Sequence, residues 1–200
     1  QLVDAIAVEQ QGLIDELAQL SKSVDHIKDI VSTQQSYAGV SSVLEPVQIS
    51  ALMEDALRMN SGALNRHHVT VVKEYAQVPQ IMADKHRLLL IMVNLISNAK
   101  YAMSSLSDRP RQMTLSIQTV ENDILQISVK DEGEGIPAEN MARIFTHGFT
   151  TRKEGHGFGL HSCALAAIEM NGRLTAHSDG PGKGALFTLQ IPLNDAAGPV

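Results

Sequence analysis

The chain has 200 residues, of which 44% are hydrophobic and 19% charged, a composition that suits one packed domain with room for a helical appendage. The net charge of −6 excludes a general affinity for nucleic acid, so any phosphate site must be local. The single cysteine, Cys163, excludes an internal disulfide, and no run of 18 apolar residues offers a membrane span. We therefore expect a cytoplasmic location, no nucleic-acid partner and no membrane segment in this chain.

The start of the sequence indicates that this chain is part of a longer protein. That longer protein could itself be anchored in a membrane. The chain begins at Gln1 rather than methionine, and no basic region followed by an apolar core indicates a signal peptide.

Residues 1–38 have the pattern of a helix that needs a partner. Apolar residues recur at alternating spacings of four and three, which is a heptad seam: Leu13, Leu17, Leu20, Val24, Ile27 and Val31. A seam this long exceeds what one small domain buries, so it favours a bundle with a second helix over a helix lying on its own domain. Residues 39–46, with small residues and a proline, form a predicted linker.

Residues 47–194 form the predicted main domain, and residues 195–200 a tail. The expected first half contains a helix capped by Ser50 and ending near Arg66, a strand Val69–Tyr75, an apolar run near Ile81, a helix capped by Asp84 and ending at Leu106, and two strands, Met113–Val120 and Ile124–Asp131, joined by a tight turn. The expected second half contains a short helix Ala138–Ile144, a polar loop 145–157, a helix Phe158–Met170, and strands Leu174–His177 and Ala185–Ile191. Strands in a row with helices between the groups predict an α+β fold, a two-layer α/β sandwich, rather than a parallel βαβ array.

Asp131 is a candidate ligand-binding residue because the strand pattern buries it. Period two places Asp131 on the same face as Leu125, Ile127 and Val129. A buried carboxylate needs a donor, and the glycines Gly133 and Gly135 let backbone approach a flat ligand, so the exocyclic amine of adenine would fit. Read alone, the stretch is more typical of a plain turn with two glycines at positive φ.

Two asparagines one turn apart, Asn94 and Asn98, interrupt the apolar helix that follows Asp84. Asparagine is a poor residue for a helix interior, so its repeated use favours side-chain oxygens offered to a partner such as Mg²⁺, which prefers hard oxygen ligands. Structural hydrogen bonding of the two amides explains the helix alone equally well.

A third element, Gly155-His-Gly-Phe-Gly-Leu160, runs from a polar loop into a helix. Backbone N–H groups at such a helix start could face phosphate oxygens. The cluster Thr150-Thr-Arg-Lys153 precedes it, and although such clusters are usually solvated patches, this one adjoins the place where an anion could be held. A P-loop and a dinucleotide-binding fingerprint are both absent from the sequence.

Five motifs, taken in order, resemble the N, G1, F, G2 and G3 boxes of sensor histidine kinases. They are Asn94-Leu-Ile-Ser-Asn98-Ala, Asp131-Glu-Gly-Glu-Gly135-Ile-Pro, Ile144-Phe145 with Phe149, Gly155-His-Gly-Phe-Gly-Leu160 and Gly182-Lys-Gly-Ala185. The resemblance covers about Pro46 to Pro192 and implies the Bergerat ATP-binding fold of the GHKL proteins, with ATP and Mg²⁺ as ligands. Residues 1–38 resemble the second helix of the kinase dimerisation hairpin.

The resemblance implies a role for each matching residue. Asp131 would receive the adenine amine, Asn98 would ligate Mg²⁺, and Asn94 would lie beside it near the phosphates. Loop 145–157 would be the mobile lid that brings its Thr-Arg-Lys sequence near the γ-phosphate. The implied ATP-binding set is Asn94, Asn98, Asp131, Gly133, Gly135, Ile136, Phe145, Thr151, Arg152, Lys153, Gly155, His156, Gly157, Phe158, Gly159 and Leu160. Tyr101 replaces the lysine that many of these kinases place three residues after the second asparagine, and Lys100 comes one position earlier.

Asn94 also separates a kinase from an ATPase. The ATPases of this fold place a glutamate at that position, where it activates water, and an amide cannot act as a general base. Transfer of the γ-phosphoryl group to an external acceptor is therefore favoured over hydrolysis. The resemblance implies that this acceptor is a histidine and that Asn94 and Asn98 are the catalytic pair. His26 is followed by Ile27 rather than by the acidic residue that the resemblance implies after the acceptor, and it lies two places after a seam residue, so we expect the phosphoacceptor upstream of Gln1.

The resemblance further implies relay to an aspartate in the receiver domain of a response regulator and a homodimer formed through the N-terminal helix. The alternatives are a Bergerat ATPase that drives a dimer clamp, an ATP-sensing module without transfer, and a protein kinase that acts on serine. Steady phosphate release would favour the first alternative, and the seam argues against the last.

Overall fold

The computed structural model describes residues 9, 10, 12, 16, 43–106, 109–121, 123–152, 155 and 157–193. The chain divides into two compact units, residues 1–40 and 41–200. In the first unit Glu9, Gln10, Gly12 and Glu16 are helical. The heptad seam and His26 lie outside the described residues, so the partnered helix stays a prediction.

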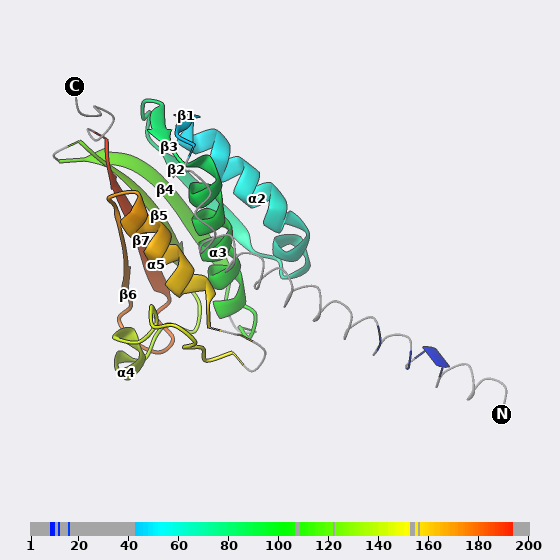
Figure 1. The fold of residues 1–200 in the computed structure, drawn as a ribbon. Coiled ribbons are helices and arrows are strands. Elements are labelled where there is room, and N and C mark those ends of the chain that lie inside the picture. The colour runs from blue at the N-terminus through cyan, green and yellow to red at the C-terminus, as the bar shows by residue number, and fades with distance from the viewer. Residues whose placement is uncertain are drawn as a thin grey trace, which may run out of the picture. The chain divides into compact units, whose positions relative to one another are not determined.

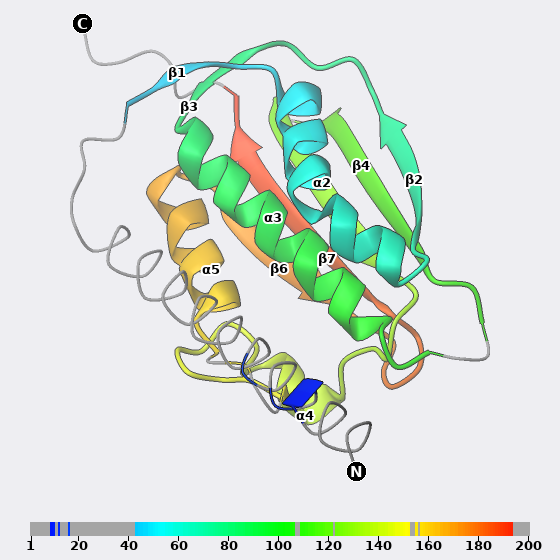
Figure 2. The same ribbon diagram turned by 90° about the vertical axis from the view of Figure 1, so that its right-hand side faces the viewer.

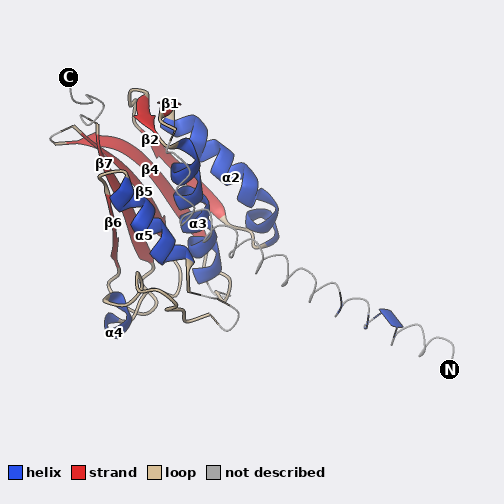
Figure 3. Cartoon of the chain, viewed as in Figure 1, coloured by secondary structure: helices blue, strands red, loops and turns tan. Residues whose placement is uncertain are grey.

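The second unit is built on a mixed five-stranded sheet (Figures 1 and 3). Its strand order is β2 (Thr70–Tyr75), β4 (Gln112–Val120), β5 (Ile124–Asp131), β7 (Ala185–Pro192) and β6 (Arg173–His177). The β2–β4 pair is parallel and the other pairs are antiparallel. Two short strands, β1 (Glu45–Val47) and β3 (Ile81–Ala83), form a separate antiparallel pair.

Three helices cover one face of this sheet, as Figure 2 shows. They are α2 (Ile49–Arg66), α3 (Lys85–Ala102) and α5 (Gly159–Glu169), and a single turn of helix, α4 (Ala138–Met141), lies in the connection between β5 and α5. The predicted two-layer α/β sandwich is confirmed. None of the helices within the described residues combines the length and apolarity that crossing a membrane requires.

The core lies between the helices and the inner face of the sheet. Alternate residues of the central strands are buried there against a stripe on α3: Met113, Leu115, Ile117, Leu125, Ile127, Val129, Phe187, Leu189, Leu88, Ile91, Leu95 and Ala99. The outer face is polar, and Gln190 Nε2 donates to Gln126 Oε1 at 3.1 Å. Because strand side chains alternate, Asp131 at the end of β5 falls on the buried face, as the sequence predicted.

Asp84 caps α3 as expected, since its side chain accepts the backbone N–H of Arg87 at 3.1 Å. The cap expected at Ser50 is wrong. The N-cap is Gln48, whose carbonyl accepts the first helical bond from Leu52, because β1 delivers the chain to the helix two residues earlier.

Two helices end before the predicted residues. The end of α3 is Ala102 rather than Leu106, because the Ala102 carbonyl accepts the N–H of Glu134 at 2.9 Å and so bonds outside the helix. The helix expected over Ala138–Ile144 is α4, which ends at Met141 and continues as non-helical turns.

Candidate functional site

The candidate site lies where β5 and α3 end and α5 begins. We divide it into two parts. The Asp131 end comprises Asp131 and two glycine loops, residues 132–137 and 178–184, and the Asn98 end comprises Asn94, Asn98, loop 145–157 and the first turn of α5. The motifs singled out in the sequence thus come from five separate segments that the fold brings to one end of the sheet (Figure 2).

Asp131 is a buried carboxylate that a backbone N–H orients. The residue is 2% exposed, and the N–H of Gly133 donates to its Oδ1 at 2.8 Å. Burial raises the pKa of Asp131 to about 6, opposed first by the backbone N–H groups of Gly133 and Ala185. The nearby Glu134 raises this pKa further, and Arg109 lowers it. At pH 7 the group is therefore mainly an ionised acceptor held in an apolar surrounding.

The two glycine loops pack backbone against backbone. Gly182 N donates to Glu134 O at 2.6 Å, and Gly184 N donates to Gly133 O at 3.2 Å. Gly135 and Gly184 both have positive φ, +72° and +70°. A Cβ at Gly135 would lie 2.1 Å from Gly180 O, and one at Gly184 would lie 2.0 Å from Asp131 O, so side chains are excluded at both positions.

Two polar side chains that the sequence analysis did not single out join these loops. Ser178 Oγ accepts the N–H of Ile136 at 3.0 Å and donates to Gly184 O at 2.6 Å. Arg109 donates from Nη1 to Gly182 O and from Nη2 to Gly133 O, each at 2.7 Å. No local pattern marks either residue, because both act on backbone that is distant in the sequence.

At the Asn98 end, the two asparagines of α3 make different contacts. Asn94 Nδ2 donates to Leu90 O at 3.1 Å, so the amide group of this residue does make a structural hydrogen bond within the helix. Its Oδ1 faces the start of α5, where a Cβ at Gly159 would lie only 2.7 Å away. Asn98 Oδ1 instead accepts a hydrogen bond from the Arg152 guanidinium, which also lies 4.1 Å from the centroid of the Tyr101 ring.

These contacts fit a magnesium ion that has one protein ligand. The Asn98 amide oxygen already faces a cation, the guanidinium of Arg152, so its position suits a positive charge. In the parts of the chain that the structure describes, no group of three or more His, Cys, Asp or Glu side chains could hold a metal ion. A cation here would therefore take most of its ligands from phosphate and water oxygens, as Mg²⁺ commonly does.

Apart from Arg152, the described residues of loop 145–157 make their hydrogen bonds mainly within the loop and with α5. Thr150 Oγ1 accepts the N–H of Arg152 at 3.1 Å, and Gly148 N donates to Gly157 O at 3.1 Å. Phe145 O lies 3.0 Å from the Nδ1 atom of His161 on α5. Thr151 is exposed, Gly155 and Phe145 are half-buried, and Lys153 and His156 lie outside the described residues.

The first turn of α5 offers backbone donors. Phe158 is the N-cap, without a side-chain hydrogen bond to the helix, and Gly159 and Leu160 begin the helix half-buried. Gly157 has a φ of +74°, and a Cβ there would lie 2.3 Å from the Gly148 carbonyl carbon. The helix N–H groups and dipole make this turn suitable for an anion.

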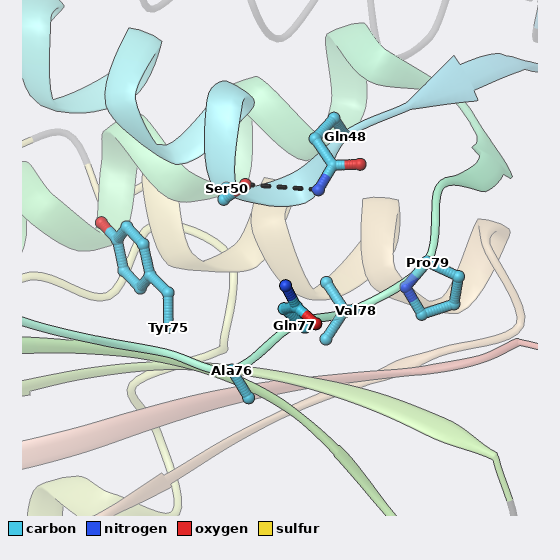
Figure 4. A pocket seen from close by; sticks show the side chains of 7 residues that line it. All are labelled: Gln48, Ser50, Tyr75, Ala76, Gln77, Val78 and Pro79. Carbon is cyan, nitrogen blue, oxygen red and sulfur yellow. Dashed lines mark hydrogen bonds between the residues drawn. The ribbon is translucent and has the colours of Figure 1, made fainter.

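A separate cavity of about 520 Å³ lies between the start of α2 and the segment after β2 (Figure 4). The cavity is lined by Gln48, Ser50, Tyr75, Ala76, Gln77, Val78 and Pro79. None of these side chains is charged, and none belongs to the predicted site. Burial, together with the Glu54 carboxylate, raises the pKa of Tyr75 above its ordinary range, so its hydroxyl stays protonated. This cavity lacks the charges that a nucleoside triphosphate requires.

Comparison with known proteins agrees with this geometry. Residues 83–195 match the family described as histidine kinase-, DNA gyrase B-, and HSP90-like ATPase. The sensor histidine kinase TmoS of Ectopseudomonas mendocina is 33% identical over 181 residues, which cover 89% of this chain and 18% of that protein. The sensor histidine kinase ZraS of Escherichia coli K12 is 30% identical over 187 residues, 92% of this chain and 39% of that protein.

Solved structures share the fold. Full-length ShkA in complex with AMPPNP superposes with a TM-score of 0.77 at 23% identity, over 96% of this chain and 40% of that one. The catalytic domain of the histidine kinase ThkA gives a TM-score of 0.66 at 21% identity, over 75% of this chain and 95% of that domain.

The chain spans 18–39% of the length of the two curated relatives named here. The family match covers more than half of the chain and includes α3, both glycine loops and α5. The resemblance to the ATP-binding part of sensor histidine kinases is confirmed, and the chain belongs to the family of histidine kinase-, DNA gyrase B- and HSP90-like ATPases.

Proposed function

We propose that this chain is the ATP-binding catalytic region of a two-component sensor histidine kinase and transfers the γ-phosphoryl group of ATP to a histidine. The observation that carries the choice of kinase over ATPase is the amide at Asn94, one turn before Asn98 on α3. Its Nδ2 is a donor to Leu90 O, and neither atom of an amide can take a proton from water at neutral pH.

The proposed binding mode follows the two ends of the site. Asp131 accepts the adenine amine, while Gly133, Gly135 and Ile136 bring backbone close to the base. The phosphates lie between Asn98 and the first turn of α5, with Gly157, Phe158, Gly159 and Leu160 as the proposed contacts. Loop 145–157 closes over them, with Phe145, Thr151, Lys153, Gly155 and His156 at its proposed contacts. A buried carboxylate with a raised pKa at one end and a helix start at the other support this orientation.

Asn98 is the residue that would hold Mg²⁺, and the ion would supply positive charge that neutralises the phosphates. Arg152, whose guanidinium donates to the Asn98 oxygen in this structure, is the proposed cationic contact of the γ-phosphate. In the transfer a histidine nitrogen forms a bond to the γ-phosphorus while the bond from phosphorus to the β,γ-bridging oxygen breaks, and ADP leaves. The chain's part is to position the nucleotide, exclude water and balance charge.

The proposed acceptor lies on a helix upstream of Gln1. The test incubates the full chain with ATP labelled at the γ-phosphate, alone and with a peptide that spans the upstream helix. Label on the added helix and none on the chain is the expected result, whereas label on the chain itself would contradict the placement of the acceptor.

The same preparation decides between kinase and ATPase. We expect negligible steady phosphate release from the wild type, and Asn94→Glu, which restores a possible base, should raise it. Fast release by the wild type that Asn94→Ala abolishes would instead support a Bergerat ATPase. ATP binding with neither release nor transfer to any acceptor would support an ATP-sensing module.

In the whole protein we propose a homodimer formed through residues 1–38, relay of the phosphoryl group to a receiver-domain aspartate of a response regulator, and a cytoplasmic position of this region. Sedimentation of the full chain and of a version that starts at Gly39 tests the first point. An unchanged oligomeric state between the two would count against it.

A further inference from the structure

Arg109 makes a contact that joins the two glycine loops of the Asp131 end. Its two terminal nitrogens donate separately to Gly133 O and Gly182 O, both at 2.7 Å. The two acceptors are 24 and 73 residues away in sequence, so the guanidinium closes a connection that local structure does not provide. The planar fork of arginine can span two carbonyls in this way, whereas the single ammonium group of lysine has no such fixed geometry.

The Gly133 peptide connects this contact to the carboxylate. Its carbonyl accepts Arg109 and the Gly184 N–H, and its own N–H donates to Asp131 Oδ1 at 2.8 Å. Gly133 is closely surrounded, because a Cβ there would lie 2.6 Å from Asp131 Oδ1 and 2.7 Å from Ala102 O. A change in the position of Gly133 would therefore alter the hydrogen bond that orients the Asp131 carboxylate, the group that is proposed to bind adenine.

We propose that Arg109 is a positioning residue for adenine recognition: it ties the two glycine loops together and thereby fixes the Gly133 N–H that orients the Asp131 carboxylate. This inference rests on the proposed binding of adenine at Asp131. Arg109 acts through backbone, and the residue is exposed at the edge of the site.

Arg111 is the matched control, two residues further along the same segment. It also donates to backbone carbonyls, but these are Leu106 O, Ser104 O and His67 O, which follow the ends of α3 and α2. Loss of its fork should lower the stability of the fold without a selective effect on the adenine base.

The experiment measures the dissociation constants of ATP and inosine triphosphate, which carries oxygen in place of the amine, for the full chain by calorimetry. Four proteins are compared: the wild type, Arg109→Gln, Arg109→Lys and Arg111→Lys. For Arg109→Gln we expect ATP affinity to fall roughly tenfold, as for loss of a charge-assisted hydrogen bond, with inosine triphosphate affinity changed less than about twofold. Arg109→Lys should lose about threefold in ATP affinity only, and Arg111→Lys should leave the ratio of the two affinities unchanged.

The pH dependence of ATP affinity gives a readout that a purely structural role would not move. Asp131 faces Glu134 and Arg109 together with the N–H groups of Gly133 and Ala185. The positive charge of Arg109 favours the ionised form of Asp131. The midpoint of the pH dependence of ATP affinity should therefore move to higher pH in Arg109→Gln and stay in place in Arg109→Lys.

Two results would overturn the inference: equal losses for both nucleotides, or wild-type affinity and wild-type pH midpoint in both Arg109 variants. Failure of the underlying assignment has a different signature, since the wild type itself would then bind ATP no more tightly than inosine triphosphate. The lysine variant retains the charge and one donor group, so it keeps the test informative if Arg109→Gln does not fold.

Discussion

The two ends of the site are built from different kinds of contact. At the Asp131 end, backbone meets backbone: Gly182 N donates to Glu134 O, Gly184 N donates to Gly133 O, and no side chain fits at Gly135 or Gly184. At the Asn98 end, one long side chain provides the link, since Arg152 reaches from loop 145–157 to Asn98 and the Tyr101 ring. Side-chain contacts of this kind exchange easily, whereas interlocked backbone does not.

This difference suggests a division of tasks. The proposed base site is already formed, so it can select the nucleotide without rearrangement. The proposed phosphate site changes its contacts when the cation and phosphates arrive, which is the behaviour expected of a loop that must open for exchange. Five predictions test the contrast.

The largest effect on nucleotide binding is expected from Asp131→Asn. The amide cannot offer two anionic acceptor oxygens to the adenine amine, so ATP affinity should fall about 100-fold, equivalent to ~2.7 kcal/mol. Calorimetric titration measures it, and circular dichroism confirms that the variant is folded. Unchanged affinity, or a bound complex with the purine elsewhere, would remove the base site from the Asp131 end.

Alanine substitutions in the second glycine loop test how tightly the backbone is interlocked. Gly184 and Gly182 have similar positive φ values, +70° and +76°, but a Cβ at Gly182 meets nothing within 4 Å. We expect Gly182→Ala to cost about 1 kcal/mol from backbone strain, and Gly184→Ala to cost about 3 kcal/mol or more because strain and overlap add. Urea denaturation of the two variants measures the difference, and equal costs would contradict the interlocked description.

Acidification should weaken ATP binding through Asp131. With a pKa of about 6, the carboxyl is mostly protonated at pH 5, so ATP affinity should be about tenfold lower there than at pH 7.5. The Asp131→Asn variant is the control for protonation of ATP itself. It should lack the part of the affinity loss that comes from Asp131.

The same titration has the opposite sign for stability. The folded-state pKa of Asp131 lies above the ordinary value of 3.8, so protonation favours the folded chain, and the carboxylate costs stability as the pH rises through about 6. Asp131→Asn should therefore be more stable than the wild type at pH 7.5, by up to about 3 kcal/mol, and equal to it near pH 4. A variant that is less stable at pH 7.5 would show that the carboxylate supports the fold.

The smallest effect on stability is expected at the other end. Arg152→Ala should change the free energy of unfolding by less than about 0.5 kcal/mol, because its contacts hold a loop rather than the core. Hydrogen exchange should nevertheless become faster in residues 148–152 of the nucleotide-free protein, and Asn98→Ala should reproduce this. Protected amides in both variants would mean that the Asn98 end is as fixed as the Asp131 end.

Local patterns predicted much of the fold. Period two placed Asp131 with Leu125, Ile127 and Val129 on the buried face, and the Asp84 side chain begins α3 because a cap acts within four residues. Ser50 failed as a cap because β1 sets where α2 starts, which no local rule contains.

The sequence motifs identified many residues of the candidate site, but they did not predict which of these residues contact one another. The motifs supplied Asp131, Asn94, Asn98 and the glycines, whose roles stay predictions. Arg109 and the contact between Arg152 and Asn98 were missed, because they join positions between 24 and 73 residues apart through long side chains. Such pairs depend on how the layers assemble.

Cys163, the single cysteine, points inward from α5 and is fully buried. Burial raises the pKa of its thiol to about 12, so very little thiolate exists at neutral pH, and thiolate is the form that alkylating reagents attack. The natively folded chain should therefore resist maleimide. A spectroscopic label could be attached at one engineered surface cysteine, for instance at exposed Thr151, and movement of loop 145–157 could be followed without first removing the natural sulfur.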